Sequence, residues 1–136
     1  MTGADITGGC LCGAVRYRVP AKPLWASHCH CASCRRSVGG AFVTWAGFRR
    51  GTVTWTGAPP RLFPSSPETV RGFCSTCGAS LSYESGRWPD ETHLTVATFD
   101  DPTAVTPTGH VYWREHVGWI ETADGLPREA GTSDDQ

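Results

Sequence analysis

Hydrophobic and polar residues alternate in short segments along most of the chain, with the two-residue period of a half-buried β-strand. Near the N-terminus, Val15, Tyr17 and Val19 alternate with Arg16 and Arg18. Similar short segments, rich in aromatic and β-branched residues, occur at 41–46, 52–56, 69–73, 80–83, 92–99 and 110–113. The pattern predicts a mainly β fold built from short strands.

Other segments lack this alternation. Residues 32–38 can form a helical turn, and Asp101 before Pro102 is typical of a helix N-terminus. Residues 58–67 contain four prolines and predict a surface loop. The segment from about residue 121 to residue 136 is rich in acidic and small side chains, so we expect it to be a partly ordered tail.

Length and charge narrow the range of functions. The 136 residues fit one domain, residues 1–136, and 12 basic against 13 acidic residues give a net charge of -1. This balance gives no reason to expect a nucleic acid or an anionic membrane as partner. The chain has no apolar run of membrane-spanning length and its first nine residues lack the features of a signal peptide. We therefore expect a cytoplasmic protein.

Seven cysteines occur in three groups, and thiols in the cytoplasm are more often metal ligands or catalytic groups than disulfides. The groups are the CxC motif Cys10 and Cys12, the CxCxxC motif Cys29, Cys31 and Cys34, and the CxxC motif Cys74 and Cys77. Close spacing lets thiolates converge on one ion. Gly13 and Gly78 follow the outer pairs, where glycine lets backbone amides turn toward the sulfurs.

Structural zinc takes four protein ligands, and catalytic zinc takes three and keeps an open position. The two outer pairs supply four cysteines, which leaves the central triplet for a second ion. His28 or His30 could instead close the triplet into a second structural site. Two weaker alternatives are a redox function for Cys31 and Cys34, and ordinary buried thiols.

The cysteine motifs, together with Arg35 and Arg36 after the triplet, resemble those of the glutathione-dependent formaldehyde-activating enzyme (GFA) family. The segments 99–102 and 110–113, and Trp119 with Ile120, are also similar to the C-terminal pattern of that family. The resemblance covers about residues 8–127. It implies a small Mss4-like β-sheet fold with two zinc ions, in which Cys10, Cys12, Cys74 and Cys77 hold a structural zinc and Cys29, Cys31 and Cys34 hold a catalytic zinc.

The family resemblance also implies an activity: the reversible addition of glutathione to formaldehyde, which in reverse is a carbon–sulfur lyase reaction on S-hydroxymethylglutathione. A zinc ion with three thiolates and an open position can deprotonate a thiol, which then attacks a nearby aldehyde. The expected partners are a small thiol such as glutathione and a small aldehyde. The alternatives are a non-catalytic carrier of a small thiol and a structural double-zinc domain that binds a protein.

Overall fold

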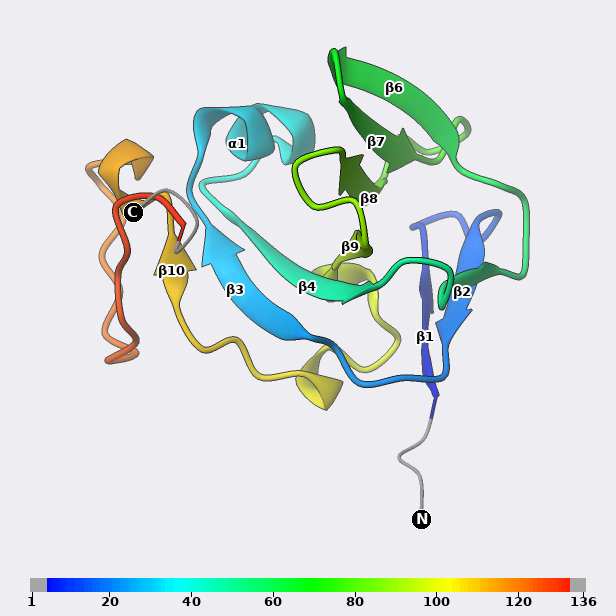
Figure 1. The fold of residues 1–136 in the computed structure, drawn as a ribbon, viewed down its shortest axis with the longest axis horizontal. Helices are drawn as coiled ribbons and strands as arrows, with labels where there is room; N and C mark the ends of the chain where they lie inside the picture. The colour runs from blue at the N-terminus through cyan, green and yellow to red at the C-terminus, as the bar shows by residue number, and fades with distance from the viewer. Residues whose placement is uncertain (1–4, 133–136) are drawn as a thin grey trace.

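The computed structural model of the chain describes residues 5–132, which form two β-sheets and one α-helix (Figure 1). The smaller sheet has the order β1-β2-β5 and comprises β1 Ile6–Gly9, β2 Arg16–Val19 and β5 Thr54–Trp55. The larger sheet has the order β10-β3-β4-β9-β8-β7-β6. Its strands are β3 Trp25–Cys29, β4 Val43–Arg49, β6 Arg61–Ser66, β7 Thr69–Phe73, β8 Ser80–Ser85, β9 Glu91–Thr95 and β10 His110–Val111. The mainly β fold class predicted from the sequence is confirmed.

The helix α1, Ala32–Val38, has the bounds that the sequence predicted. It begins at Cys31, whose sulfur accepts a hydrogen bond from the amide of Cys34, and ends at Gly39 in the left-handed conformation. Three short 3₁₀ helices follow β9: η1 Val96–Thr98, η2 Pro102–Ala104 and η3 Trp113–Glu115. Asp101 caps η2 through the amide of Thr103, as expected. No helix among residues 5–132 is long and apolar enough to span a membrane.

The strands of the larger sheet are antiparallel except for the parallel pair of β10 and β3. On β4, Gly47 lies opposite Trp25 of β3, and a Cβ at Gly47 would meet the indole ring at 2.4 Å. The indole therefore lies flat across the sheet, and its Nε1 donates to Oε1 of Glu91 on β9. This contact fixes three adjacent strands at the position where the cavity described below opens.

Two hydrophobic clusters form the core. The first packs the two sheets together and contains Tyr17, Phe48, Leu81 and Leu94, all nearly inaccessible to solvent, together with Cys10 and Cys74. The second lies between α1 and β4 and contains Cys29, Cys34, Val43 and Trp45. The outer cysteines and the triplet are thus parts of different clusters.

Two expectations about chain segments were wrong. Residues 58–67 do not form a loop, because Arg61–Ser66 pairs with β7 as the edge strand β6. The segment is exposed as expected, and Pro64 is tolerated because an edge strand leaves one side of its backbone unpaired. The segment 92–99 is a strand only to Thr95, after which the chain turns into η1. β1 and β3 were not predicted.

Residues 121–132 of the expected tail run beside β10 (Figure 1). The amide of His110 donates to the carbonyl of Pro127 at 2.8 Å, and the amide of Glu129 donates to the carbonyl of His110 at 2.9 Å. Residues 133–136 lie outside the described residues. Much of the C-terminal segment is therefore bound to the sheet by backbone hydrogen bonds.

Candidate metal centres and the cavity between them

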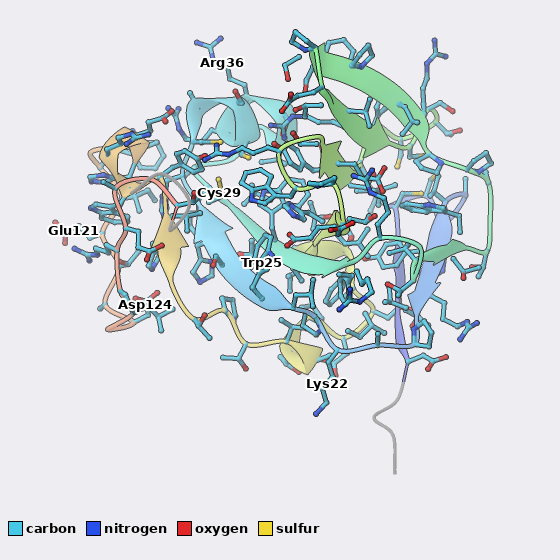
Figure 2. The ribbon with its side chains drawn as sticks, in the orientation of Figure 1. Lys22, Trp25, Cys29, Arg36, Glu121 and Asp124 are labelled. Carbon is cyan, nitrogen blue, oxygen red and sulfur yellow. The ribbon has the colours of Figure 1, made fainter. Side chains whose placement is uncertain are left out.

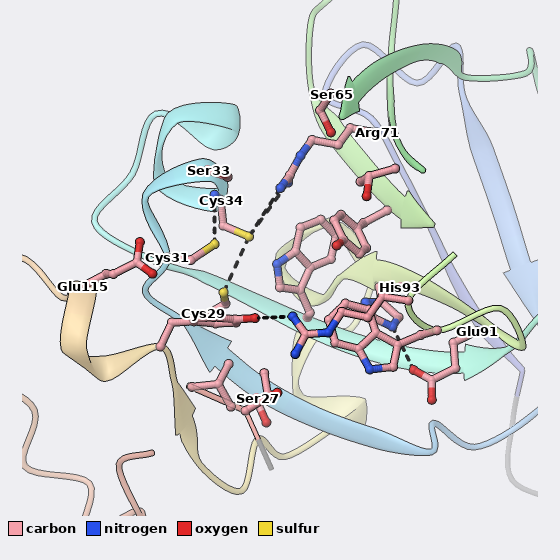
Figure 3. Close-up of a pocket in the computed structure, with 18 of the residues that line it drawn as sticks. Ser27, Cys29, Cys31, Ser33, Cys34, Ser65, Arg71, Glu91, His93 and Glu115 are labelled. Atoms are coloured by element: carbon pink, nitrogen blue, oxygen red, sulfur yellow. Dashed lines mark hydrogen bonds and ion pairs between the residues drawn. The ribbon is translucent and has the colours of Figure 1, made fainter. Parts of the chain in front are cut away.

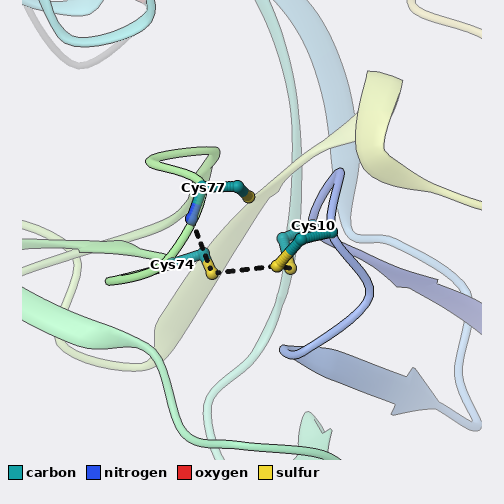
Figure 4. A group of neighbouring side chains, drawn as sticks. Cys10, Cys74 and Cys77 are labelled. Carbon is teal, nitrogen blue, oxygen red and sulfur yellow. Dashed lines mark hydrogen bonds between the residues drawn. The ribbon is translucent and has the colours of Figure 1, made fainter.

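The four outer cysteines come together from two turns, one after β1 and one between β7 and β8 (Figure 4). Their sulfur atoms all lie within 4.8 Å of one another, as required for ligands of one ion. Cys12 Sγ lies 3.6 Å from Cys10 Sγ and 3.7 Å from Cys74 Sγ, although 62 residues separate Cys12 from Cys74. The fold therefore brings the CxC and CxxC motifs into one four-sulfur group.

Backbone amides point at the sulfurs of this group. Val15 N lies 3.2 Å from Cys10 Sγ, and the amides of Thr76 and Cys77 each lie 3.4 Å from Cys74 Sγ. The turns that permit this depend on Gly13 and Gly78, whose φ angles are +84° and +79°. Burial opposes the ionisation of Cys10, but the Val15 amide and the neighbouring thiols lower its pKa to about 6.

The central triplet surrounds the N-terminus of α1 (Figure 3). Cys29 ends β3, Cys31 is the N-cap of α1 and Cys34 lies in its first turn, so that residues 31 and 34 share one side of the helix. The three sulfurs lie within 4.8 Å of one another, with Cys29 and Cys34 3.5 Å apart. Hydrogen bonds with Cys29 and Cys31 lower the pKa of Cys34 to about 2, whereas hydrogen bonds with Cys31 and Cys34 raise the pKa of Cys29.

His28 and His30 point away from the triplet. Side chains alternate along β3, so the residues on either side of Cys29 lie on the opposite face of the sheet. His28 Nδ1 lies 2.8 Å from Thr44 Oγ1, and His30 Nε2 lies 2.9 Å from His110 Nδ1. The structure therefore does not bring either histidine to the triplet, and the closed site considered from the sequence has no fourth ligand from them.

A cavity of about 660 Å³ opens beside the triplet, and all three of its cysteines line the wall. Within the described part of the chain, none of the four outer cysteines lines this cavity. The two groups thus differ in their surroundings. The triplet opens onto the cavity, whereas the four-sulfur group has Cys10 and Cys74 buried in the core and Cys12 exposed on the surface.

Arg71 on β7 reaches the triplet from across the cavity, a position that no motif in the sequence indicated. Its Nη1 lies 3.8 Å from Cys34 Sγ and donates to Ser37 Oγ at 3.2 Å, while its guanidinium lies over the ring of Tyr83. The guanidinium charge acts with the two thiols to lower the pKa of Cys34. Arg71 therefore gives this anionic group a fixed positive neighbour.

A second group missed in the sequence lines the same cavity from β9. His93 Nε2 lies 2.8 Å from Glu91 Oε1, and the imidazole packs between Tyr83 and Trp25 (Figure 3). Burial lowers the pKa of His93 and so favours the neutral imidazole, with Glu91 acting in the opposite direction. A neutral imidazole beside a carboxylate can accept a proton from a molecule in the cavity.

Two comparisons point to the same family, and a third concerns the fold. The family model described as "Glutathione-dependent formaldehyde-activating enzyme" matches residues 5–115. A curated protein of Halomonas elongata, provisionally named as a glutathione-dependent formaldehyde-activating enzyme, is 26% identical over 125 residues, covering 85% of this chain and 80% of the relative. A crystal structure of a Rhodobacter sphaeroides protein superposes with a TM-score of 0.59 at 22% identity, over 90% of this chain and 98% of the other. The last likeness concerns the fold alone.

Proposed function

Because the chain belongs to the glutathione-dependent formaldehyde-activating enzyme family, we propose that it is a zinc-dependent carbon–sulfur lyase, and in reverse a synthase, acting on a thiol–aldehyde adduct. The adduct class includes S-hydroxymethylglutathione. The observation that carries the proposal is the asymmetry between the cysteine groups: the triplet lines a cavity and the four-sulfur group does not. This difference fits one open catalytic site and one closed structural site.

The residues present fit two zinc ions. Seven thiols fall into groups of four and three with sulfurs within 4.8 Å, and each group contains a cysteine whose pKa lies below its usual value. Cys10, Cys12, Cys74 and Cys77 would hold the structural ion, and Cys29, Cys31 and Cys34 the catalytic one. Zinc held by three thiolates supplies an open position at which a substrate sulfur is stabilised as a thiolate.

The chain's own residues supply charge and proton transfer. Arg71 offsets the negative charge of the triplet from one side of the cavity. In the lyase direction the carbon–sulfur bond of R–S–CH₂–OH breaks, the bonding electrons stay on sulfur, and the hydroxyl proton passes to His93 as the aldehyde forms. In the synthase direction the sulfur attacks the carbonyl carbon and the same proton returns to oxygen. Glu91 orients the imidazole and stabilises its protonated form.

Exchange spectroscopy tests this proposal directly. Zinc-loaded protein is added to glutathione and ¹³C-formaldehyde, and NMR measures the rate of exchange between free formaldehyde and the hydroxymethyl adduct. We expect the protein to accelerate exchange and the Cys31→Ser variant to leave it at the uncatalysed rate. Binding of glutathione without acceleration would favour the carrier alternative. No binding of any thiol tested would favour the structural double-zinc domain.

A further inference from the structure

A third group of ligand-type side chains lies on the face of β3 opposite to the triplet. His28 comes from β3, and His110 lies beside it on the parallel strand β10. Asp124 belongs to the C-terminal segment, which pairs back to β10 through Arg128, and Figure 2 shows it on this segment. We propose that His28, His110 and Asp124 form a third metal site, for a first-row divalent cation that accepts imidazole and carboxylate together, such as Zn²⁺ or Co²⁺.

The distances suit such an ion. One ring nitrogen of each histidine and one carboxylate oxygen of Asp124 lie within 4.8 Å of one another. His110 Nε2 and Asp124 Oδ2 are already 2.8 Å apart. Ligands at zinc-type distances of about 2.0–2.2 Å in a tetrahedron are about 3.3–3.6 Å from each other. Binding therefore requires this 2.8 Å contact to open by about 0.5–0.8 Å, a displacement within the freedom of the partly exposed Asp124 side chain.

Each candidate ligand has its other polar atom held by a second partner. His28 Nδ1 bonds to Thr44 Oγ1, which leaves Nε2 available. His110 Nδ1 bonds to His30 Nε2, and Asp124 Oδ1 accepts from the amide of Leu126 at 3.1 Å, which leaves His110 Nε2 and Asp124 Oδ2. Metal ligands in proteins are characteristically oriented by such second contacts. Because all three side chains are oriented by a second hydrogen bond, the group differs from a chance cluster of titratable side chains.

The hydrogen bonds also define what metal binding changes. An ionised carboxylate only accepts, so His110 carries its proton on Nε2 toward Asp124, and its Nδ1 accepts from His30 Nε2. A metal at His110 Nε2 moves the proton to Nδ1, from which it is donated to His30, and the His30 proton moves to its own Nδ1. That atom is buried without a partner among the described residues. The unpaired N–H makes this site weaker than either cysteine site.

Occupation of the site would tie the C-terminal segment to β3. Glu129 and Thr132 of this segment line the cavity beside the triplet. The site therefore has a structural role in holding one wall of that cavity, and its existence does not depend on the lyase proposal.

Cobalt titration of protein whose cysteine sites are already filled with zinc provides the test. Cobalt that enters a thiolate site shows an intense sulfur-to-metal charge-transfer band, and cobalt at an imidazole–carboxylate site does not. We expect one further Co²⁺ per chain to bind without that band. Asp124→Asn should weaken this binding more than tenfold, and His28→Gln should do the same. Glu121→Gln removes a carboxylate of the same segment that lies apart from the group, and should bind as the parent does.

Imidazole NMR on the same zinc-loaded samples, titrated with additional Zn²⁺, gives a second reading. We expect His110 to change from the Nε2–H to the Nδ1–H tautomer in the parent and in Glu121→Gln, but not in Asp124→Asn. The proposal is overturned if zinc-loaded parent protein binds no further cobalt, if Asp124→Asn and Glu121→Gln bind it equally, or if the His110 tautomer does not change.

Discussion

At the residue scale, the sulfur of Cys31 combines two roles: it caps α1 by accepting from the Cys34 amide at 3.2 Å, and it belongs to the triplet. Serine is also a favourable N-cap, so Cys31→Ser retains the helix while it removes one ligand. We predict a melting temperature near that of the parent, a fall from two tightly bound zinc ions to one, and loss of glutathione binding. Calorimetric titration and melting curves on the same samples measure these effects.

Ser33→Ala is the matched control for Cys31→Ser, because Ser33 lines the same cavity two residues further along the chain and does not belong to the three-sulfur group. It should bind zinc and glutathione as the parent does. A Cys31→Ser protein that collapses, or one that binds glutathione unchanged, would contradict the assignment of the triplet.

Replacement of His93 by Gln should separate chemistry from binding. Gln fills much of the same space but cannot take up the proton, so we predict a loss of about 10²–10⁴-fold in turnover with thiol affinity nearly unchanged. Burial places the pKa of His93 below its usual 6.5. The lyase rate of the parent should therefore be constant above that pKa and fall as the pH drops through it, because protonated His93 cannot accept the hydroxyl proton.

The charged and titratable groups around His93 are Glu91 on its own strand, Tyr83, Arg50 and Cys34. His93→Gln leaves all four in place. A fall in rate at low pH that the His93→Gln variant shares with the parent therefore reports protonation of the cysteine site. A fall that occurs in the parent alone reports protonation of His93. Identical rate profiles for the two proteins would exclude His93 as the proton acceptor.

Sequence spacing reveals local groups and misses distant ones. The three cysteine motifs were apparent because their members lie within a few residues of one another. Arg71 is 37 residues from Cys34, and only the folded sheet, in which β7 pairs with β6 and β8, brings it to the triplet. In the sequence, His93 is one polar residue of an alternating segment. Its place in the cavity depends on stacking on Tyr83, which only the structure shows.

At the element scale, the turn between β7 and β8 carries Cys74 into the core, where it is 1% exposed. Cys74→Ser would remove one ligand of the four-sulfur group and leave three thiols without a complete site. We predict an insoluble or unfolded protein, because zinc binding to such a site contributes about 10 kcal/mol or more to folding. Soluble yield, zinc content and circular dichroism measure the outcome.

Ser75→Ala is the control for this turn. The exposed Ser75 lies next to Cys74, and the amides that donate to Cys74 Sγ are those of Thr76 and Cys77. It should fold with full zinc content. A well-folded Cys74→Ser protein with an unchanged zinc content would rule out the four-cysteine assignment.

Local signals predicted most strands near their positions, although several bounds differ: the segment 41–46 forms β4 at 43–49, and 110–113 is a strand only to Val111. Thr69–Phe73 alternates and is followed by a cysteine turn, and it forms β7 as predicted. Trp25–Cys29 has no alternation of its own, because β3 is specified by its pairing with β4 and by the fit of Trp25 over Gly47. Pro64 concealed β6, since proline excludes a central strand but not an edge strand.

At the scale of the whole molecule, the four-sulfur group joins the two sheets. Cys10 and Cys12 follow a strand of the smaller sheet, and Cys74 and Cys77 follow a strand of the larger one. Backbone contacts also tie β1 to the chain just after β9, through the bridge of Gly8 and Phe99 and the hydrogen bond from the Asp100 amide to the Thr7 carbonyl at 2.8 Å. The triplet instead spans six residues and crosslinks little of the chain.

Removal of metal should therefore occur in two stages. We predict that a mild chelator takes zinc from the triplet first, because three thiolates and an exchangeable position hold an ion less firmly than four thiolates, and that the protein stays folded with glutathione binding lost. Stronger chelation should remove the second zinc together with the fold. Metal analysis beside circular dichroism follows both stages. Loss of the fold with the first ion would contradict the division of roles between the two groups.

The two glycines that shape the four-sulfur group are required because their backbone is in the left-handed conformation, and not because a side chain would lack space. Gly13 and Gly78 have φ angles of +84° and +79°, yet a Cβ at either position would meet no atom within 4 Å. L-Alanine should cost about 1–2 kcal/mol there, because its backbone disfavours positive φ. D-Alanine prefers that region, and by restricting the unfolded chain it should stabilise the protein by about 0.4–1 kcal/mol. Unfolding curves of semisynthetic protein carrying each enantiomer at position 78 should therefore shift in opposite directions.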